Sequence, residues 1–344
     1  MTDATGGWGV AYAATEQTAA IWRTTDRGES WLDVTPSGMA LPTGPFPGWI
    51  EWVFLDRNRA WIAFPAEGDY QSAEIESSFW FTQDGGSSWD RRPLPAWDVE
   101  AAVFFQFIDD QHGWFMTEDY AGAGSSWYSL SRTQDGGRSW DGLMAEDHAV
   151  HEYSVGIEFA DENTGLMNFG HDYYYITLPY VRWTRDGGLS WEDLLFLPAP
   201  DDDPGLLERA FCGTYQPHLF STLSAVLAVN CHDPTTREPV ARLLYSTSDG
   251  GSSWDTVPYP GGRIQFLDPQ LGWALGLEVY RTQDGGQTWT QMGSVPWEGQ
   301  FSFVDESRGW AVSQSETAAG AVFGLYRTED GGRTWIELPA VLVH

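Results

Sequence analysis

The sequence contains no lysine. Its 18 basic residues are all arginines and stand against 49 acidic residues, which gives a formal net charge of −31. A surface of this sign repels nucleic acid and anionic lipid, so we expect neither as a partner. It is compatible with cationic partners, with a salty environment, or with a well-solvated surface that has no partner. No apolar run reaches the roughly 18 residues that a membrane span needs, so we expect no direct membrane insertion. The 20 tryptophans supply a large core and argue against disorder.

Cysteine is scarce: Cys212 and Cys231 are the two in the chain, and they flank a predicted hairpin. Free thiols of a cytosolic protein are one explanation. We favour a disulfide across antiparallel strands, which implies an oxidising compartment. The N-terminus shows no signal-peptide pattern and begins almost inside a repeat. We therefore expect an extracytoplasmic protein (secreted, periplasmic or on the cell surface) whose signal segment is absent from this chain.

What the chain has in abundance is a repeat. The motif Thr-x-Asp-x-Gly-x-Ser/Thr-Trp occurs seven times at a mean spacing of about 51 residues, close to one blade of a large propeller repeat. The aspartates of the seven copies are Asp26, Asp84, Asp135, Asp186, Asp249, Asp284 and Asp330. The aspartate can accept backbone N–H bonds and the glycine can take a positive φ, so each copy predicts a structural turn.

A second marker runs in phase with the first. An aspartate precedes Trp8, Trp61, Trp114, Leu166, Trp273 and Trp310 by five residues. Between the markers, aromatic and β-branched runs predict four antiparallel strands per repeat. We predict an all-β, seven-bladed β-propeller that spans residues 1–344 as one domain, with the repeated motif in each turn between strands 3 and 4.

Closure of the ring depends on how the first blade is completed. Only Met1 and Thr2 precede Asp3, so the first blade has no innermost strand of its own. We expect residues 341–344 to fill that place by pairing with Gly7–Ala13.

The motif is identified as the Asp-box, or bacterial neuraminidase repeat, of sialidases, sortilin-type receptors and some xyloglucan-cleaving glycosidases. Gly-Trp-Ala at 272–274 and 309–311, followed by Tyr-Arg-Thr-x-Asp-Gly-Gly-x-Thr-Trp at 280–289 and 326–335, most resembles Ycf48-type photosystem II assembly factors. That resemblance implies a non-catalytic propeller that engages a protein outside the cytoplasm. Because this chain is strongly acidic, we expect a general binding propeller rather than one with a photosystem client.

The ligand face is expected opposite the Asp-boxes, where the loops are longer and more varied. Histidines, acids and aromatic residues gather in those loops. The candidate ligand-face residues are Tyr120, Trp127, His148, His151, His171, Asp172, Tyr173, Tyr174, Tyr175, His232 and Asp233.

This composition leaves several functions open. The histidines and acids can ligate a metal, although solvated surface histidines are the simpler explanation, and we expect no cofactor. Acidic and aromatic surface suits a basic peptide or a stacked glycan. The alternative is a glycoside hydrolase, either sialidase-like or of another Asp-box type. A sialidase needs arginines in a central pocket, and four can reach the ligand face: Arg209, Arg237, Arg242 and Arg263. We predict a monomeric, non-catalytic propeller that binds a protein or carbohydrate.

Overall fold

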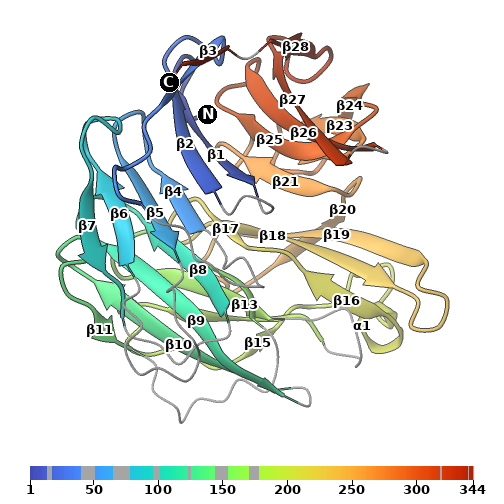
Figure 1. Ribbon diagram of the computed structural model, residues 1–344. Coiled ribbons are helices and arrows are strands. Elements are labelled where there is room, and N and C mark those ends of the chain that lie inside the picture. Colours follow the sequence, from blue (N-terminus) through green and yellow to red (C-terminus); the bar gives the residue numbers. More distant parts are fainter. Residues whose placement is uncertain are drawn as a thin grey trace.

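The computed structural model describes residues 1–13, 18–39, 51–64, 78–95, 101–122, 125–143, 154–169, 178–317, 320–339 and 341–343. These residues form seven sheets, six of four strands and one of five, arranged as the blades of a propeller, with one helical turn, α1 (Leu206–Arg209) (Figure 1). The predicted all-β, seven-bladed fold is therefore confirmed. In the described part of the chain, no helix combines the length and apolar character required to cross a bilayer.

The blades share one strand order, from the centre to the rim. The innermost strands of blades 2 to 7 are β4 (Glu51–Phe54), β8 (Ala101–Phe107), β12 (Ser154–Phe159), β16 (Phe211–Thr214) with β17 (His218–Leu219), β21 (Arg263–Phe266) and β25 (Glu298–Phe303). The second strands of blades 1 to 7 are β1 (Gly7–Ala13), β5 (Ala60–Phe64), β9 (Gly113–Gly122), β13 (Gly165–Phe169), β18 (Ala225–His232), β22 (Gly272–Leu275) and β26 (Gly309–Thr317).

The outer half of each blade follows the same pattern. The third strands are β2 (Thr18–Thr24), β6 (Ser78–Thr82), β10 (Ser125–Thr133), β14 (Tyr180–Thr184), β19 (Pro239–Thr247), β23 (Glu278–Thr282) and β27 (Gly320–Thr328). The fourth strands are β3 (Ser30–Asp33), β7 (Asp90–Pro93), β11 (Asp141–Gly142), β15 (Leu195–Phe196), β20 (Asp255–Pro258), β24 (Thr290–Ser294) and β28 (Ile336–Leu338).

The middle strands are apolar on both sides because a neighbouring blade covers each face of the sheet. In β5, Trp61 and Ile62 point to opposite faces and both are fully buried. The same holds along β22, where Gly272–Leu275 are all buried. These strands therefore read as continuous apolar runs rather than as an alternation of apolar and polar residues.

The expected pairing of residues 341–344 with Gly7–Ala13 is wrong. The C-terminal strand β29 (Val341–Val343) does join blade 1, but at the outer edge, where it runs parallel to β3 with Val341 opposite Ser30. Chain length explains the difference. The chain from Leu338 to Val341 spans at most about 11 Å. The distance across a blade, from its fourth strand to its first strand, is about 14 Å. The C-terminal strand pairs at the rim because it cannot reach the centre.

Candidate functional site

The repeated aspartates close turns rather than line a cavity. At Asp284 the carboxylate accepts bonds from the hydroxyl of Thr282 (2.8 Å) and from the amide (2.9 Å) and hydroxyl (2.6 Å) of Thr288. The hydrogen bonds from Thr288, with that from Thr282, hold the pKa of Asp284 below its usual range. The same hydroxyl and amide bonds recur at Asp26, Asp84, Asp135, Asp186, Asp249 and Asp330.

Each of these turns, called Asp turns below, is tied to the turn between strands 1 and 2 of its own blade. In blade 7 the N–H of Gly331 donates to the carbonyl of Ser307 at 2.8 Å, and each of the other six blades has the equivalent bond. Asp305 in turn accepts the amides of Ser307 and Arg308. Both sets of turns therefore lie on one face of the propeller, called the Asp face. In blade 5 Ser221 replaces the aspartate of the second marker, which is why the sequence pattern misses that turn.

The predicted ligand-face residues fall mostly outside the described part of the chain. His148, His151, His171, Asp172, Tyr173, Tyr174 and Tyr175 all lie in the ranges that the structure does not describe. Tyr120 and Trp127 are opposite each other in the register of β9 and β10. The remaining two, His232 and Asp233, lie at the end of the long hairpin β18–β19.

Asp233 has a structural role in that hairpin. Its carboxylate accepts the amides of Thr235 and Thr236 at 2.8 Å, and these bonds hold its pKa below the usual range. His232 is opposite Phe211 in the sheet, and the guanidinium of Arg237 lies over the Phe211 ring. Within the described residues no group of three His, Cys, Asp or Glu side chains is placed to hold a metal ion. Among the described residues, His232 and Asp233 are therefore not part of a metal-binding group.

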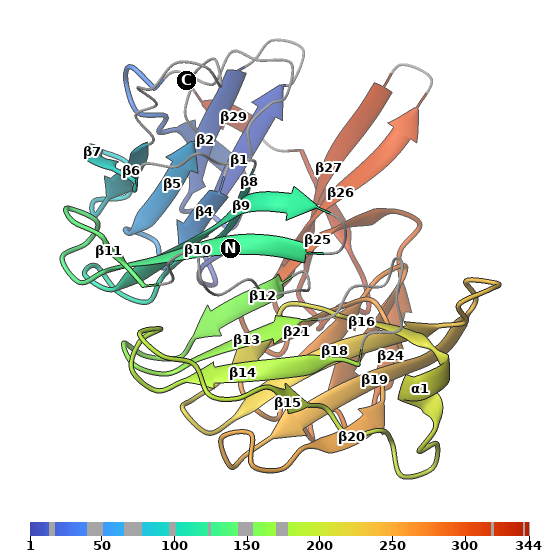
Figure 2. The same cartoon turned by 90° about the horizontal axis from the view of Figure 1, so that it is seen from below.

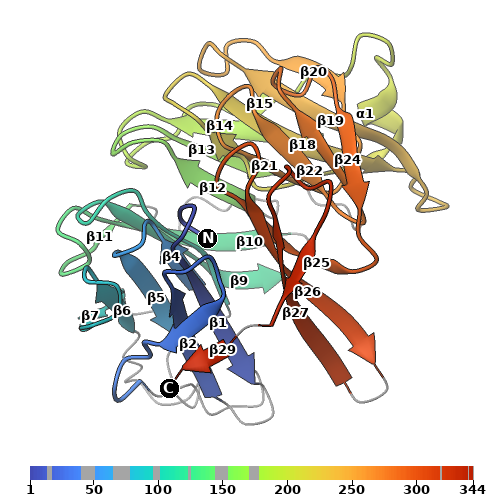
Figure 3. The ribbon, with the colours of Figure 1, turned by 90° about the horizontal axis from the view of Figure 1, so that it is seen from above.

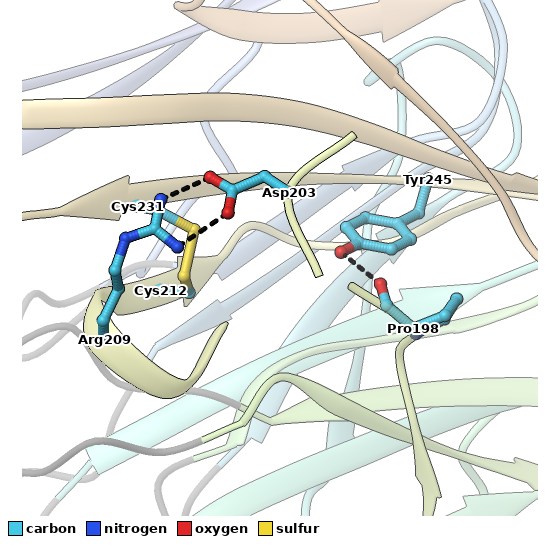
Figure 4. The surroundings of a disulfide bond; sticks show 6 residues. All are labelled: Pro198, Asp203, Arg209, Cys212, Cys231 and Tyr245. Atoms are coloured by element: carbon cyan, nitrogen blue, oxygen red, sulfur yellow. Dashed lines mark hydrogen bonds and ion pairs between the residues drawn. A yellow bond between two sulfur atoms is a disulfide. The ribbon is translucent and has the colours of Figure 1, made fainter. Parts of the chain in front are cut away.

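Blade 5 also contains the disulfide. Cys212 in β16 and Cys231 in β18 are directly opposite in register and are bonded to each other (Figure 4). Nearby, Arg209 of α1 forms a bidentate ion pair with Asp203 (Figure 4). Of the four arginines that were expected to reach the ligand face, two more have contacts of this kind. The Arg237 guanidinium lies over the Phe211 ring, and Arg242 donates to the carbonyl of Pro260. The fourth, Arg263, has a different environment, described below.

Neighbouring blades are joined near the centre by stacked aromatic pairs. A tryptophan on the second strand of one blade lies flat against a phenylalanine on the innermost strand of the next. These pairs are Trp8–Phe54, Trp61–Phe107, Trp114–Phe159 and Trp273–Phe303, with ring centroids 5.7, 4.6, 3.8 and 4.2 Å apart. In each pair the phenylalanine stands two residues before the aspartate of the second marker. This spacing is visible in the sequence, but the structure is needed to show that the phenylalanine stacks on a tryptophan of the preceding blade.

The junction of blade 7 with blade 1 differs from the others. Met1 takes the phenylalanine position: a Cβ added to Gly7 would meet its sulfur, as a Cβ on Gly309 would meet the Phe303 ring. Ser302 exchanges two hydrogen bonds with the backbone of Met1, as Gln265 does with Phe303. Met1 thus marks the last position of an innermost strand whose other positions are not filled by any described residue.

A cleft of about 1090 Å³ lies in the unfilled space. Its walls are formed by the following residues of blades 1, 2 and 7: Trp8, Gly9, Val10, Ala11, Trp31, Trp52, Phe54, Glu298, Gly299, Gln300, Phe301, Ser302, Trp310, Ala311, Val312, Gln314, Phe323 and Leu325. Figures 2 and 3 show the β26–β27 hairpin of blade 7 diverging from the β1–β2 hairpin of blade 1. At the rim the two blades stay joined, because the indole N–H of Trp310 donates to the carbonyl of Arg27 at 2.8 Å.

The mouth of the cleft is aromatic and carries one charge of each sign. Trp52, Val312 and Phe323 are 42%, 47% and 65% exposed, which is high for large apolar side chains in adjoining walls. Arg263 and Glu298 also line the cleft, and neither has an ion-pair partner among the described residues. Inner strands run towards the Asp face, so these first residues of β21 and β25 lie at the opposite end. The cleft therefore opens on the face where a ligand site was expected.

The sequence gives no single signal for this cleft. Its lining comes from four different blades. Of its residues, Arg263 alone belongs to the set expected to reach the ligand face.

No protein-family model matches this chain, and no curated protein matches its sequence. Solved structures with the same fold do exist. An ulvan lyase of polysaccharide lyase family 25, bound to a glucuronate–sulfated rhamnose oligosaccharide, has a TM-score of 0.58 at 12% identity over 96% of this chain and 90% of the lyase. The polysaccharide lyase Uly1 has a TM-score of 0.60 at 8% identity over 95% and 88%. YCF48 from Cyanidioschyzon merolae has a TM-score of 0.50 at 14% identity over 87% of both chains. At these identities the similarity establishes the propeller fold.

Proposed function

We propose that this protein is a non-catalytic binding propeller that holds an extended protein or glycan ligand in the cleft between blades 7 and 1. The observation that carries this proposal is the exposed aromatic and apolar surface of Trp52, Val312 and Phe323 at the mouth of one large cleft. Ligand sites are concave and mostly apolar, with a few polar groups that orient the ligand. Arg263 and Glu298 supply those groups here.

The residues in the cleft support binding better than hydrolysis. Glycoside hydrolysis needs two carboxyl groups about 5–10 Å apart on either side of the bond that breaks. Glu298 is the carboxylate among the residues that line the cleft, and Glu51 of the adjoining strand alternates to the other side of β4 from Trp52. A glycosidase that acted in this cleft would therefore need a second carboxylate from a residue that does not line it.

An extracytoplasmic location, as in Ycf48-type factors, fits this function. The Cys212–Cys231 disulfide is of a kind that persists in oxidising compartments. Disulfide content gives a direct check: protein isolated from its native source under alkylating conditions should contain no free thiol. Two free thiols in that material would place the protein in a reducing compartment.

The binding function is tested with a panel of extended peptides and polysaccharides, ulvan among them, with the wild-type protein and the variants Trp52→Ala and Phe196→Ser. Phe196 is exposed on the outer strand of blade 4, away from the cleft, and serves as the control. We expect at least one ligand to bind with an affinity that falls tenfold or more in Trp52→Ala and is unchanged in Phe196→Ser. Release of shortened sugar chains that stops in Glu298→Gln would replace binding by catalysis.

A further inference from the structure

Several innermost strands are linked to the next blade by one side chain, three residues before the position of the second-marker aspartate. In blade 3 the amide group of Gln106 exchanges two hydrogen bonds with the backbone of Phe159 in blade 4, at 2.9 and 3.2 Å. Gln265 of blade 6 forms the same pair of bonds with Phe303 of blade 7. A glutamine fits this position because its amide group both accepts from an N–H and donates to a carbonyl. These two links carry no charge, so they do not depend on pH.

Blades 4 and 5 have ionisable residues at the same position. Glu158 of β12 accepts the backbone N–H of Leu219 in blade 5 at 3.3 Å, as the glutamine of blade 3 does for its neighbour. His218 of β17 is hydrogen-bonded to the backbone of Phe266 in blade 6. The two side chains also contact each other, since Nδ1 of His218 lies 3.6 Å from Oε2 of Glu158. A carboxylate and an imidazole therefore replace two of the uncharged links.

The partners of His218 favour its protonated form. Burial lowers the pKa of the imidazole, but the Glu158 carboxylate and the Phe266 backbone outweigh burial and raise this pKa above its usual value of 6.5. Because the bond to Phe266 favours the charged ring, the partner there is the carbonyl oxygen. A neutral imidazole donates one N–H, whereas an imidazolium donates two. The imidazolium is therefore the form that links blade 5 to blade 4 and to blade 6 at once.

The strands around His218 present few charges to it. On β18 the residue opposite His218 is the buried Val226. The charged residue of β21, Arg263, begins that strand and stands at the other end from Phe266. Among the described residues, Glu158 is the charged group that contacts His218 from these strands, and its side chain is 17% exposed. The charge of this one histidine therefore decides how strongly β17 is held by the neighbouring blades.

The strand that carries His218 has little else to hold it. The ladder between β17 and β18 consists of two residue pairs, His218 with Val226 and Leu219 with Ala225. The rest of the innermost position in blade 5 is formed by β16, which is separate from β17. Segments with few ladder bonds open locally at lower free energy than the remainder of a sheet. Loss of one link to a neighbouring blade should therefore loosen β17 without unfolding blade 5.

We propose that Glu158 and His218 form a pH-sensitive latch at the centre of the propeller. With His218 protonated, the latch is closed and ties β17 to the innermost strands of blades 4 and 6. When the imidazole loses its proton, one of the two links opens and β17 loosens. The residues of the latch do not line the cleft between blades 7 and 1, so this inference is independent of the binding function.

The direction of the pH dependence follows from the raised pKa of His218. Folding binds the proton more tightly, so the contribution of the latch to stability is complete below the unfolded pKa of about 6.5. That contribution is lost as pH rises through the folded pKa. The latch is therefore closed in mildly acidic solution and open in alkaline solution.

The chain supplies matched control variants, because glutamine holds the equivalent position in blades 3 and 6. Hydrogen exchange of segment 216–220, corrected for the intrinsic exchange rate, is measured at about pH 5.5 and about pH 8.5. In the wild type we expect protection of this segment to fall at least tenfold at the higher pH. His218→Gln should show no such fall, and the Phe159 amide, held by Gln106, should keep its protection in both proteins.

A second measurement does not depend on the folding of His218→Gln. The titration of the His218 ring, followed by NMR in the wild type and in Glu158→Gln, should show proton affinity at least threefold weaker in the variant. Glutamine at position 158 can still accept the Leu219 N–H, so the variant keeps that link. Equal affinities in the two proteins would overturn the latch. A pH-dependent loss of protection that persists in His218→Gln would overturn it as well.

Discussion

Single aspartates close both kinds of turn on one face of every blade but the fifth, where Ser221 closes one of them. Each carboxylate of the repeated motif accepts at least one backbone and two hydroxyl bonds, which reproduces the same turn despite different intervening residues. The side chains are exposed or partly exposed on that face, yet both oxygens of each carboxylate accept hydrogen bonds. Their role is therefore structural.

The first prediction concerns one of these turns. Asp284→Ala removes three hydrogen bonds to Thr282 and Thr288, and we expect it to lower the free energy of unfolding by about 1–3 kcal/mol. Chemical denaturation followed by circular dichroism measures the loss. Asp255→Ala, at an exposed position just beyond another Asp turn, is the control and should change little. Equal effects of the two substitutions would contradict a bracing role.

The second prediction concerns Glu51, a half-buried carboxyl on β4. Burial raises its pKa to about 7. The folded state therefore binds the Glu51 proton more tightly than the unfolded state does, so the contribution of this group to stability is complete below about pH 4.5 and is lost as pH rises through 7. We expect Glu51→Gln to be about 1–2 kcal/mol more stable than wild type at pH 8, and the two to converge near pH 4.5. Chemical denaturation at both pH values measures the difference in unfolding free energy between Glu51→Gln and wild type, with Glu337→Gln at an exposed position as the control. A difference that does not change with pH would contradict the raised pKa of Glu51.

At the scale of elements, blade 5 is the one that departs most from the repeat. Its innermost position is divided between β16 and β17, and its hairpin β18–β19 extends well beyond the sheet. The disulfide fixes β16 to β18 where this division weakens the ordinary ladder.

The third prediction follows from this. Cys212→Ser with Cys231→Ser opens a loop closed over 19 residues and should lower stability by about 3 kcal/mol. The loss should appear as a lower urea midpoint. Addition of a reductant should destabilise the wild type to the same extent and leave the double variant unchanged. A wild type that is insensitive to reductant would contradict the prediction.

At the scale of the whole molecule, the repeat made the fold predictable and concealed the site. Seven regular copies of the Asp turn define seven blades, so the replacement of one second-marker aspartate by Ser221 in blade 5 does not obscure the fold. The place of the last strand depends on a single short connection after Leu338, and sequence reasoning put it at the wrong edge. The cleft was not predicted because Trp52, Arg263, Glu298 and Phe323 come from separate blades and are far apart in the sequence, so no local pattern brings them together.

Amide hydrogen exchange with and without a bound ligand tests the central claim, that ligands bind between blades 7 and 1. The account predicts increased protection of Val10–Tyr12 in β1 and of the facing residues 310–314 and 323–325 in blade 7, with the seven Asp turns unchanged. Protection confined to the β18–β19 hairpin, or to the Asp face, with β1 unchanged, would contradict it.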